Sequence, residues 1–184
     1  ETGYQTAMIG KWHLRSDPQG FDYWNVLPGQ GHYYNPDFIE MGERKRHTGY
    51  VTDITTDFAL DWLKNQRDPE RPFCMLLHHK APHRNWKPAQ EYLTLFDDTT
   101  FDPPANFFDT YENRGSAARE QEMEIAEHMR WGHDFKFVVD PNGDSTGFMR
   151  ELNRLNEEQL AGWNAAYEPK NQSLTENMLQ GKEL

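Results

Sequence analysis

Hydrophobic positions in the first half of the chain form short apolar runs on either side of one helical stripe. Tyr4–Ile9 is mainly apolar and is followed by Gly10, which indicates a strand that feeds a loop. Apolar residues recur at spacings of three or four between Val51 and Trp62, so the pattern predicts a helix over Thr52–Asn65. Phe73–Leu77 is a continuous apolar run, which predicts a strand buried on both faces. The order strand, helix, strand predicts an α/β fold with a mostly parallel sheet flanked by helices.

Patterns elsewhere are weaker. Pro18–Pro36 is rich in Gly, Pro and Asn, which indicates an irregular segment. Further elements are expected as a strand pair within Phe38–His47, a loop over Leu95–Tyr111, a polar helix over Ala117–Met129, a strand over Phe135–Val139, a turn over Pro141–Asp144 and an amphipathic helix over Phe148–Trp163.

Composition adds a charge asymmetry. The 184 residues carry a net charge of −11, but residues 1–96 hold 12 acidic and 11 basic side chains, while 97–184 hold 18 and 8. An acidic surface repels nucleic acid, so no nucleic-acid partner is expected, whereas the nearly neutral first half permits an anion site. No apolar run approaches the ~20 residues of a membrane-spanning helix. The single cysteine, Cys74, excludes an internal disulfide.

The first candidate for chemistry is the segment that follows the first predicted strand. Gly10 allows a sharp turn and a close approach to a ligand. Lys11 supplies a compact positive charge, and His13 lies two residues further on. A lysine and a histidine at a strand end can bind a tetrahedral oxyanion such as sulfate or phosphate. A surface loop with a solvated lysine is the alternative.

The second candidate is His78–Lys87, which holds three His, two Lys and one Arg directly after the second predicted strand. Histidine is the natural proton donor near neutral pH, and Pro82 fixes the chain before His83. Closely spaced histidines also indicate a metal site, but the segment contains no carboxylate or cysteine, so no metal ligand is assigned. In open α/β sheets the ligand crevice lies beyond the carboxyl ends of the strands, where both candidates fall.

These residues carry a resemblance to a known family. Gly3–His13 resembles the second signature of the formylglycine-dependent sulfatases at every position, through Gly3, Tyr4, Thr6 and the run Gly10-Lys11-Trp12-His13. His78–Trp86 resembles the strand-end segment in which a Pro-His pair faces the sulfate. Within it, His79–Trp86 is most similar to bacterial N-acetylglucosamine-6-sulfatases and mucin-desulfating sulfatases. Gly20–Trp24 and Gly29–Gly31 also fit the family pattern.

The resemblance implies an alkaline-phosphatase-like α/β fold and the hydrolysis of a sulfate ester by a formylglycine hydrate beside calcium. It assigns Lys11 to the sulfate and the formylglycine, and His13 to the formylglycine hydroxyl and the elimination of sulfate. It assigns His83 to a sulfate oxygen near the leaving oxygen, as a candidate general acid. Arg84, Asn85 and Trp86 are candidates for contacts to the sugar, with packing under the loop as the alternative for Trp86. The family location is extracytoplasmic, either periplasmic or secreted.

The departures from the family pattern concern the nucleophile and the metal. No Cys-X-Pro/Ala-X-Arg motif is present, and Cys74 lies inside a predicted strand. Asp97-Asp98 does not occupy the position of the family's early metal carboxylates. We therefore expect an internal sulfatase fragment, with a core carrying the sulfate motifs over 1–90 and an acidic, loop- and helix-rich part over 91–184. Calcium ligands, formylglycine and the rest of the domain are expected outside it.

Two other classes of function remain open. One is a non-catalytic module that binds a sulfated glycan or a protein. The other is a phosphate or phosphonate ester hydrolase of the same superfamily. Among sulfated sugars, the resemblance favours N-acetylglucosamine-6-sulfate in glycosaminoglycan or mucin glycans.

The missing nucleophile generates the first prediction. The purified 184-residue chain should release no sulfate from 6-sulfated N-acetylglucosamine. Measurable turnover by this chain alone, assayed as sulfate released over time, would show that the interpretation as a fragment is wrong.

Overall fold

The computed structural model describes residues 3–123, 128–137 and 152–179. The chain divides into two units, one of Glu1–Lys87 with Arg150–Glu158 and one of Pro88–Met149 with Gln159–Leu184. The elements of the first unit are β1 (Gln5–Trp12), β2 (Tyr23–Pro28), β3 (Asp37–Glu40), β4 (Glu43–Arg46), α1 (Val51–Asp61), η1 (Trp62–Gln66) and β5 (Phe73–His78). Those that follow are η2 (Gln90–Tyr92), α2 (Ser116–Arg119), α4 (Trp131–Asp134) and α6 (Glu157–Leu179).

One mixed sheet organises the first unit, with the strand order β4-β3-β2-β1-β5. β1 pairs in parallel with β2 on one side and with β5 on the other. β3 and β4 extend the sheet through antiparallel pairing. The predicted α/β fold is confirmed, although the antiparallel pairs make the sheet mixed.

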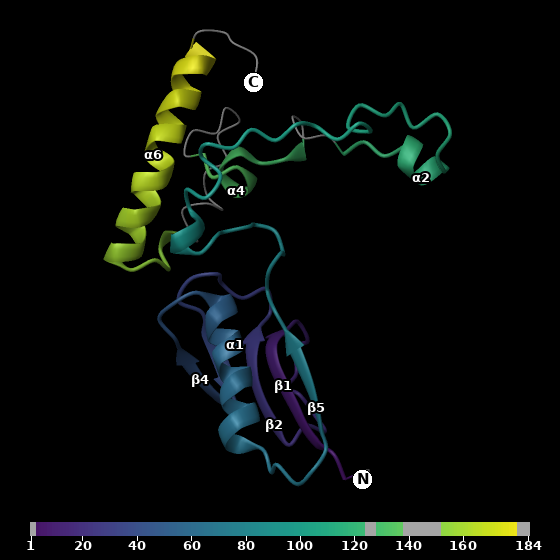
Figure 1. Cartoon of the computed structure of the whole chain (residues 1–184), viewed down its shortest axis with the longest axis vertical. Helices are drawn as coiled ribbons and strands as arrows, with labels where there is room; N and C mark the ends of the chain where they lie inside the picture. Colours follow the sequence, from purple (N-terminus) through teal and green to yellow (C-terminus); the bar gives the residue numbers. More distant parts are fainter. Residues whose placement is uncertain (1–2, 124–127, 138–151, 180–184) are drawn as a thin grey trace. The chain divides into compact units, whose positions relative to one another are not determined.

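The helix formed by α1 and η1 covers one face of this sheet, as Figure 1 shows. Ala7 and Ile9 of β1 pack against Ala59 and Trp62 in a core of buried side chains. The period-2 alternation of β1 directs its odd-numbered residues to this face, and Met8 packs on the opposite face. The predicted helix over residues 52–65 is confirmed.

Two predictions for the first unit are wrong, the irregular conformation of residues 18–36 and the burial of Phe73–Leu77. β2 lies inside the segment predicted to be irregular. The pattern hides this strand because its buried run, residues 24–27, is short and bounded by turn residues. β5 forms as predicted, but it is the edge strand of this sheet. Phe73, Leu76 and Leu77 are therefore 42%, 39% and 37% exposed instead of buried.

Predictions for the second half are less successful. Of the helix predicted over 117–129, the structure forms α2, which ends before Glu120, and residues 121–123 are not helical. Residues 124–127 lie outside the described residues, and His128 is helical. Residues 135–137 follow α4 and form no strand, while 138–139, the turn over 141–144 and Phe148 lie outside the described residues. The predicted helix over 148–163 is interrupted, because Asn153–Asn156 is not helical and α6 begins at Glu157. Apolar spacing alone could not locate this start or the extension to Leu179.

No helix in the described ranges combines the length and the hydropathy that a membrane crossing requires.

Gly10 provides a test of the β1–β5 pairing. It has φ +104°, and a β-carbon there would overlap the main-chain carbonyl of His78. Gly10→Ala should lower the free energy of unfolding by about 3 kcal/mol or more, because a left-handed conformation costs a non-glycine residue about 1–2 kcal/mol before any clash. Urea unfolding followed by circular dichroism measures the change.

Gly42 is the matched control, since it has φ +97° and no atom within 4 Å of an added β-carbon. Gly42→Ala should cost only the conformational strain. Equal losses at the two positions would contradict the close approach of β1 to β5.

Candidate anion-binding site

The carboxyl ends of β1 and β5 lie side by side at one edge of the sheet. In the parallel pair Gly10 lies opposite His78. Lys11, the next residue of β1, lies opposite Leu27 of β2. The loops that follow β1, β2 and β5 therefore leave the sheet at the same edge, where α/β proteins bind ligands. The predicted meeting of the two chemistry-bearing segments is confirmed by this register.

Lys11 is the cation that β1 places at this edge. Its ammonium donates a hydrogen bond of 2.7 Å to the side-chain oxygen of Gln30. Partial burial lowers the pKa of Lys11, because removal from water penalises the charged form. A lysine ammonium has three donors. Within the described residues only Gln30 accepts one of them, so the others are available to the oxygens of an anion.

The loop Gly29–Gly31 holds Gln30 in place. The N–H of Gly29 donates to the carbonyl of Trp12 over 3.0 Å, which ties the loop to the end of β1. Gly29 and Gly31 have φ +60° and +65°, a region that favours glycine. A β-carbon at Gly31 would overlap the buried side chain of Leu27. A single polar residue is thus presented between two glycines that the turn requires.

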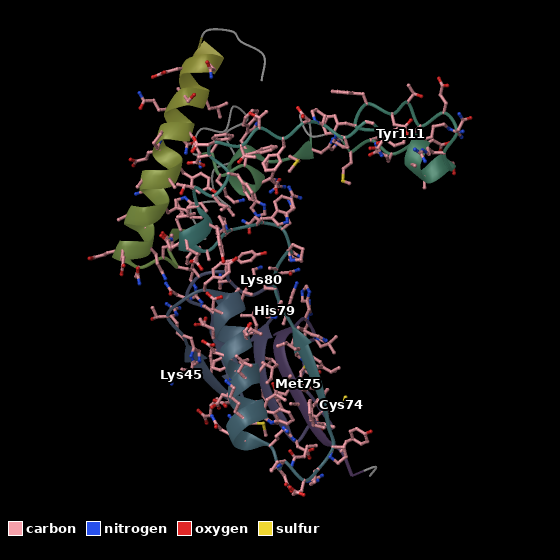
Figure 2. All side chains as sticks on the ribbon, in the orientation of Figure 1. Lys45, Cys74, Met75, His79, Lys80 and Tyr111 are labelled. Carbon is pink, nitrogen blue, oxygen red and sulfur yellow. The ribbon has the colours of Figure 1, made fainter. Side chains whose placement is uncertain are left out.

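Lys80 anchors the same loop from the end of β5. Its side chain is buried, with the residue 5% exposed, and its ammonium donates to the main-chain oxygen of Gln30 over 2.9 Å. The ammonium also lies 4.5 Å from the ring centroid of Tyr33, within the range of a cation–π interaction. Figure 2 shows Lys80 and His79 beyond the carboxyl end of β5. Gln30 therefore accepts hydrogen bonds from Lys11 through its side chain and from Lys80 through its main chain.

His83 is placed by its main-chain contacts. Its N–H donates to the carbonyl of Lys80 over 3.0 Å, and its carbonyl accepts from the hydroxyl of Tyr33 over 2.7 Å. Its Nδ1 contacts the carbonyl oxygen of Arg84, and its side chain is exposed. Because Lys80 and Tyr33 also contact each other, one chain of contacts runs from Lys11 to His83.

His13 lies just beyond β1 with an exposed side chain. Together with Arg15 and Arg44 it lines a cavity of about 650 Å³. No hydrogen bond joins His13 to Lys11 or His83 in the part of the chain that the structure describes. The structure thus connects two of the three predicted catalytic residues and leaves the third on a neighbouring cavity.

The predicted sugar-contacting residues follow His83 directly. Arg84 is exposed, Asn85 is 5% exposed and Trp86 is 42% exposed. The indole N–H of Trp86 donates to the carbonyl of Pro82 over 2.7 Å. Its ring is therefore anchored and still offers a surface to a ligand. Their contact with a sugar remains a prediction.

Metal-ligating side chains do not gather at this edge. Over the described ranges, no group of three or more His, Cys, Asp or Glu residues is arranged to hold a metal ion. The clustered residues His78 and His79 are exposed. Cys74 lies along β5, where Figure 2 labels it, and it is exposed. The predicted burial of Cys74 is wrong because β5 is an edge strand.

Sequence reasoning missed the roles of Gln30, Tyr33 and Lys80. In the sequence, Gly29–Gly31 carries only a family pattern, and Lys80 contributes only charge. The available signal was a polar residue between two glycines, directly after the apolar run Trp24–Leu27. That pattern predicts a tight turn at the end of a strand, where side chains reach ligands.

Comparisons with known proteins agree on one family. A family model described as Sulfatase matches residues 1–158. N-acetylglucosamine-6-O-sulfatase of Bacteroides thetaiotaomicron is 47% identical over 190 residues, a match that covers 100% of this chain and 34% of that protein. N-acetylglucosamine-6-sulfatase of Homo sapiens is 30% identical over 120 residues, covering 57% of this chain and 22% of that protein.

One solved structure has the same fold over nearly the whole chain. It is a protein in complex with its substrate D-glucosamine-2-N,6-O-disulfate, and it matches with a TM-score of 0.84 and 46% identity. The match covers 95% of this chain and 36% of that chain. The chain therefore spans about a third of the length of the Bacteroides sulfatase and of the protein in this solved structure.

The contact between Tyr33 and His83 generates a prediction for the site. Tyr33→Phe removes the hydroxyl that donates to the carbonyl of His83. The free energy of unfolding should fall by about 1–3 kcal/mol, because a partly buried carbonyl loses its donor. Urea unfolding measures the loss, and faster hydrogen exchange at the His83 amide should report the loosened loop.

Tyr4→Phe is the control, because Tyr4 is 50% exposed. If both variants unfold at the same urea concentration as the unchanged chain, the hydroxyl of Tyr33 does not hold His83.

Proposed function

The chain belongs to the sulfatase family, and from this premise we propose that it forms part of the sulfate pocket of a sulfuric ester hydrolase. The substrate is a sulfated sugar. The observation that carries the proposal is the chain of contacts that links Lys11 indirectly to His83 at the carboxyl ends of β1 and β5. That arrangement presents a cation and a proton-bearing side chain to the same edge of the sheet.

The chemistry follows from the charges of a sulfate ester. Its non-bridging oxygens carry the negative charge, which the ammonium of Lys11 stabilises. Cleavage leaves an alkoxide that needs a proton, and the exposed imidazole of His83 is the group we propose as its donor. His13, on the adjacent cavity, is proposed as a second proton carrier beside the nucleophile.

The substrate class is proposed from the relatives. Two of them are named as N-acetylglucosamine-6-sulfatases, which favours a 6-sulfated N-acetylglucosamine in glycosaminoglycan or mucin glycans. Arg84, Asn85 and Trp86 are proposed to contact the sugar. The exposed ring of Trp86 supports this role, because an aromatic face packs against the apolar face of a pyranose.

Calcium and formylglycine are proposed as the cofactors of the complete enzyme. The described residues do not fit either group by themselves, since they contain no metal-ligating cluster and Cys74 lies within β5. No step is therefore derived through either one. We propose that the rest of the sulfatase domain supplies them, and that the protein acts outside the cytoplasm, in the periplasm or after secretion.

Alanine substitutions in the complete enzyme test the proposal. Lys11→Ala and His83→Ala should each lower kcat/KM for 6-sulfated N-acetylglucosamine by about 100-fold or more, because one stabilises charge and the other donates a proton. Sulfate release measured across substrate concentrations gives this ratio.

Lys45→Ala is the matched control for charge, since Lys45 is exposed on β4, and it should change kcat/KM by less than about twofold. Unchanged rates for Lys11→Ala and His83→Ala would contradict the site. Binding without turnover would favour a glycan-binding module, and preference for the phosphate ester would favour a phosphatase.

A further inference from the structure

Gln30 is the residue through which two lysines of the site are joined. Its side-chain oxygen accepts from Lys11 over 2.7 Å, and its main-chain oxygen accepts from Lys80 over 2.9 Å. Two loops, one after β2 and one after β5, are therefore fixed with respect to the end of β1. A substitution at this position changes only the first of these contacts, because the main-chain oxygen is present in every variant.

The amide of Gln30 suits a lysine that must keep its charge. Lysine loses about 2 kcal/mol of rotamer freedom when its side chain is held, so an anchoring acceptor prepares the ammonium for an anion. A carboxylate acceptor would form an ion pair and cancel much of the positive charge that attracts the anion. A neutral carbonyl holds the ammonium and leaves its charge available.

The surrounding loop adds rigidity to this contact. Gly31 donates to the carbonyl of Pro28 over 3.1 Å, and Gly29 donates to the carbonyl of Trp12. Lys80 is buried, whereas the side chain of Gln30 is exposed. The anchor of the loop is thus inside the protein while its amide lies at the surface, where a ligand approaches.

We propose that Gln30 is a positioning residue for anion binding, which holds the Lys11 ammonium toward the sulfate group while remaining neutral. This role rests on the proposed function. Gln30 acts through Lys11. Its side chain must supply an uncharged oxygen that accepts a hydrogen bond from the Lys11 ammonium. Glutamate at this position would lower the affinity for a sulfated sugar even though its length and packing are nearly the same.

Substitutions of Gln30 in the complete protein separate positioning from charge. Gln30→Met keeps the side-chain length and removes the acceptor, and Gln30→Glu keeps the acceptor and adds a negative charge. The chain is labelled with ¹⁵N-lysine, and Lys11→Arg identifies the Lys11 ammonium signal by its loss. Two quantities are measured by NMR, namely the hydrogen-exchange rate of the Lys11 ammonium without ligand and the Kd for glucosamine 6-sulfate.

The two variants should differ in opposite ways. Gln30→Met should raise the exchange rate of the Lys11 ammonium and weaken binding by about threefold, the value of a modest hydrogen bond. Gln30→Glu should keep the exchange slow and yet weaken binding by about tenfold or more, because the carboxylate neutralises the ammonium. Gln19 is the control, because it is exposed and lies in the loop between β1 and β2. Gln19→Met and Gln19→Glu should change neither the exchange rate nor the Kd.

Separate outcomes overturn the two proposals. An exchange rate that is the same in Gln30→Met and the unchanged chain would overturn the positioning role. Equal Kd values for Gln30→Met and Gln30→Glu would overturn the need for neutrality. If the complete protein binds no glucosamine 6-sulfate although Gln30→Met accelerates exchange, the proposed function fails while the contact between Gln30 and Lys11 stands.

Discussion

The pairing of β1 on both of its edges determines how the first unit is built. Parallel neighbours on either side direct the carboxyl ends of β1, β2 and β5 to one edge, so the three loops that follow them leave the sheet together. Gly10 makes the β1–β5 approach possible because a β-carbon would overlap the carbonyl of His78. The same glycine was expected from sequence to approach a ligand. In the structure it approaches a neighbouring strand, and Lys11 after it faces the site.

Electrostatics at this edge depend on how each cation is held. The ammonium of Lys80 is buried, and its contacts with Gln30 and the Tyr33 ring compensate for the loss of water. Lys11 remains partly accessible, and the acceptor that it finds among the described residues is a neutral amide. Lys80 therefore stabilises the loops, and Lys11 keeps its charge for an anion. Neither role is visible in a net charge for the whole chain.

The sequence predicted the parts of the fold whose patterns are local. The helical stripe from Val51 to Trp62 and the apolar run of β5 identify their elements through spacing alone. The burial of β5 could not be predicted, because exposure depends on strand order and β5 lies at an edge. β2 could not be predicted, because its sequence is short and lies among the Gly, Pro and Asn residues that are typical of loops.

For the site, the sequence proposes Lys11 and His83 as candidates, and the structure links them through a chain of contacts. The family resemblance groups His13 with them. In the structure it lies just beyond β1 on a neighbouring cavity, and its role stays a prediction. Gln30 and Tyr33 lie between the two motifs in the sequence, and only the fold brings them to His83 and Lys11.

A crystal structure of the complete protein bound to glucosamine 6-sulfate tests the central claim most directly. The account predicts that the sulfate oxygens lie within hydrogen-bond distance of Lys11 Nζ and of the His83 imidazole. A sulfate bound instead in the cavity lined by Arg15 and Arg44, with no contact to Lys11, would contradict it.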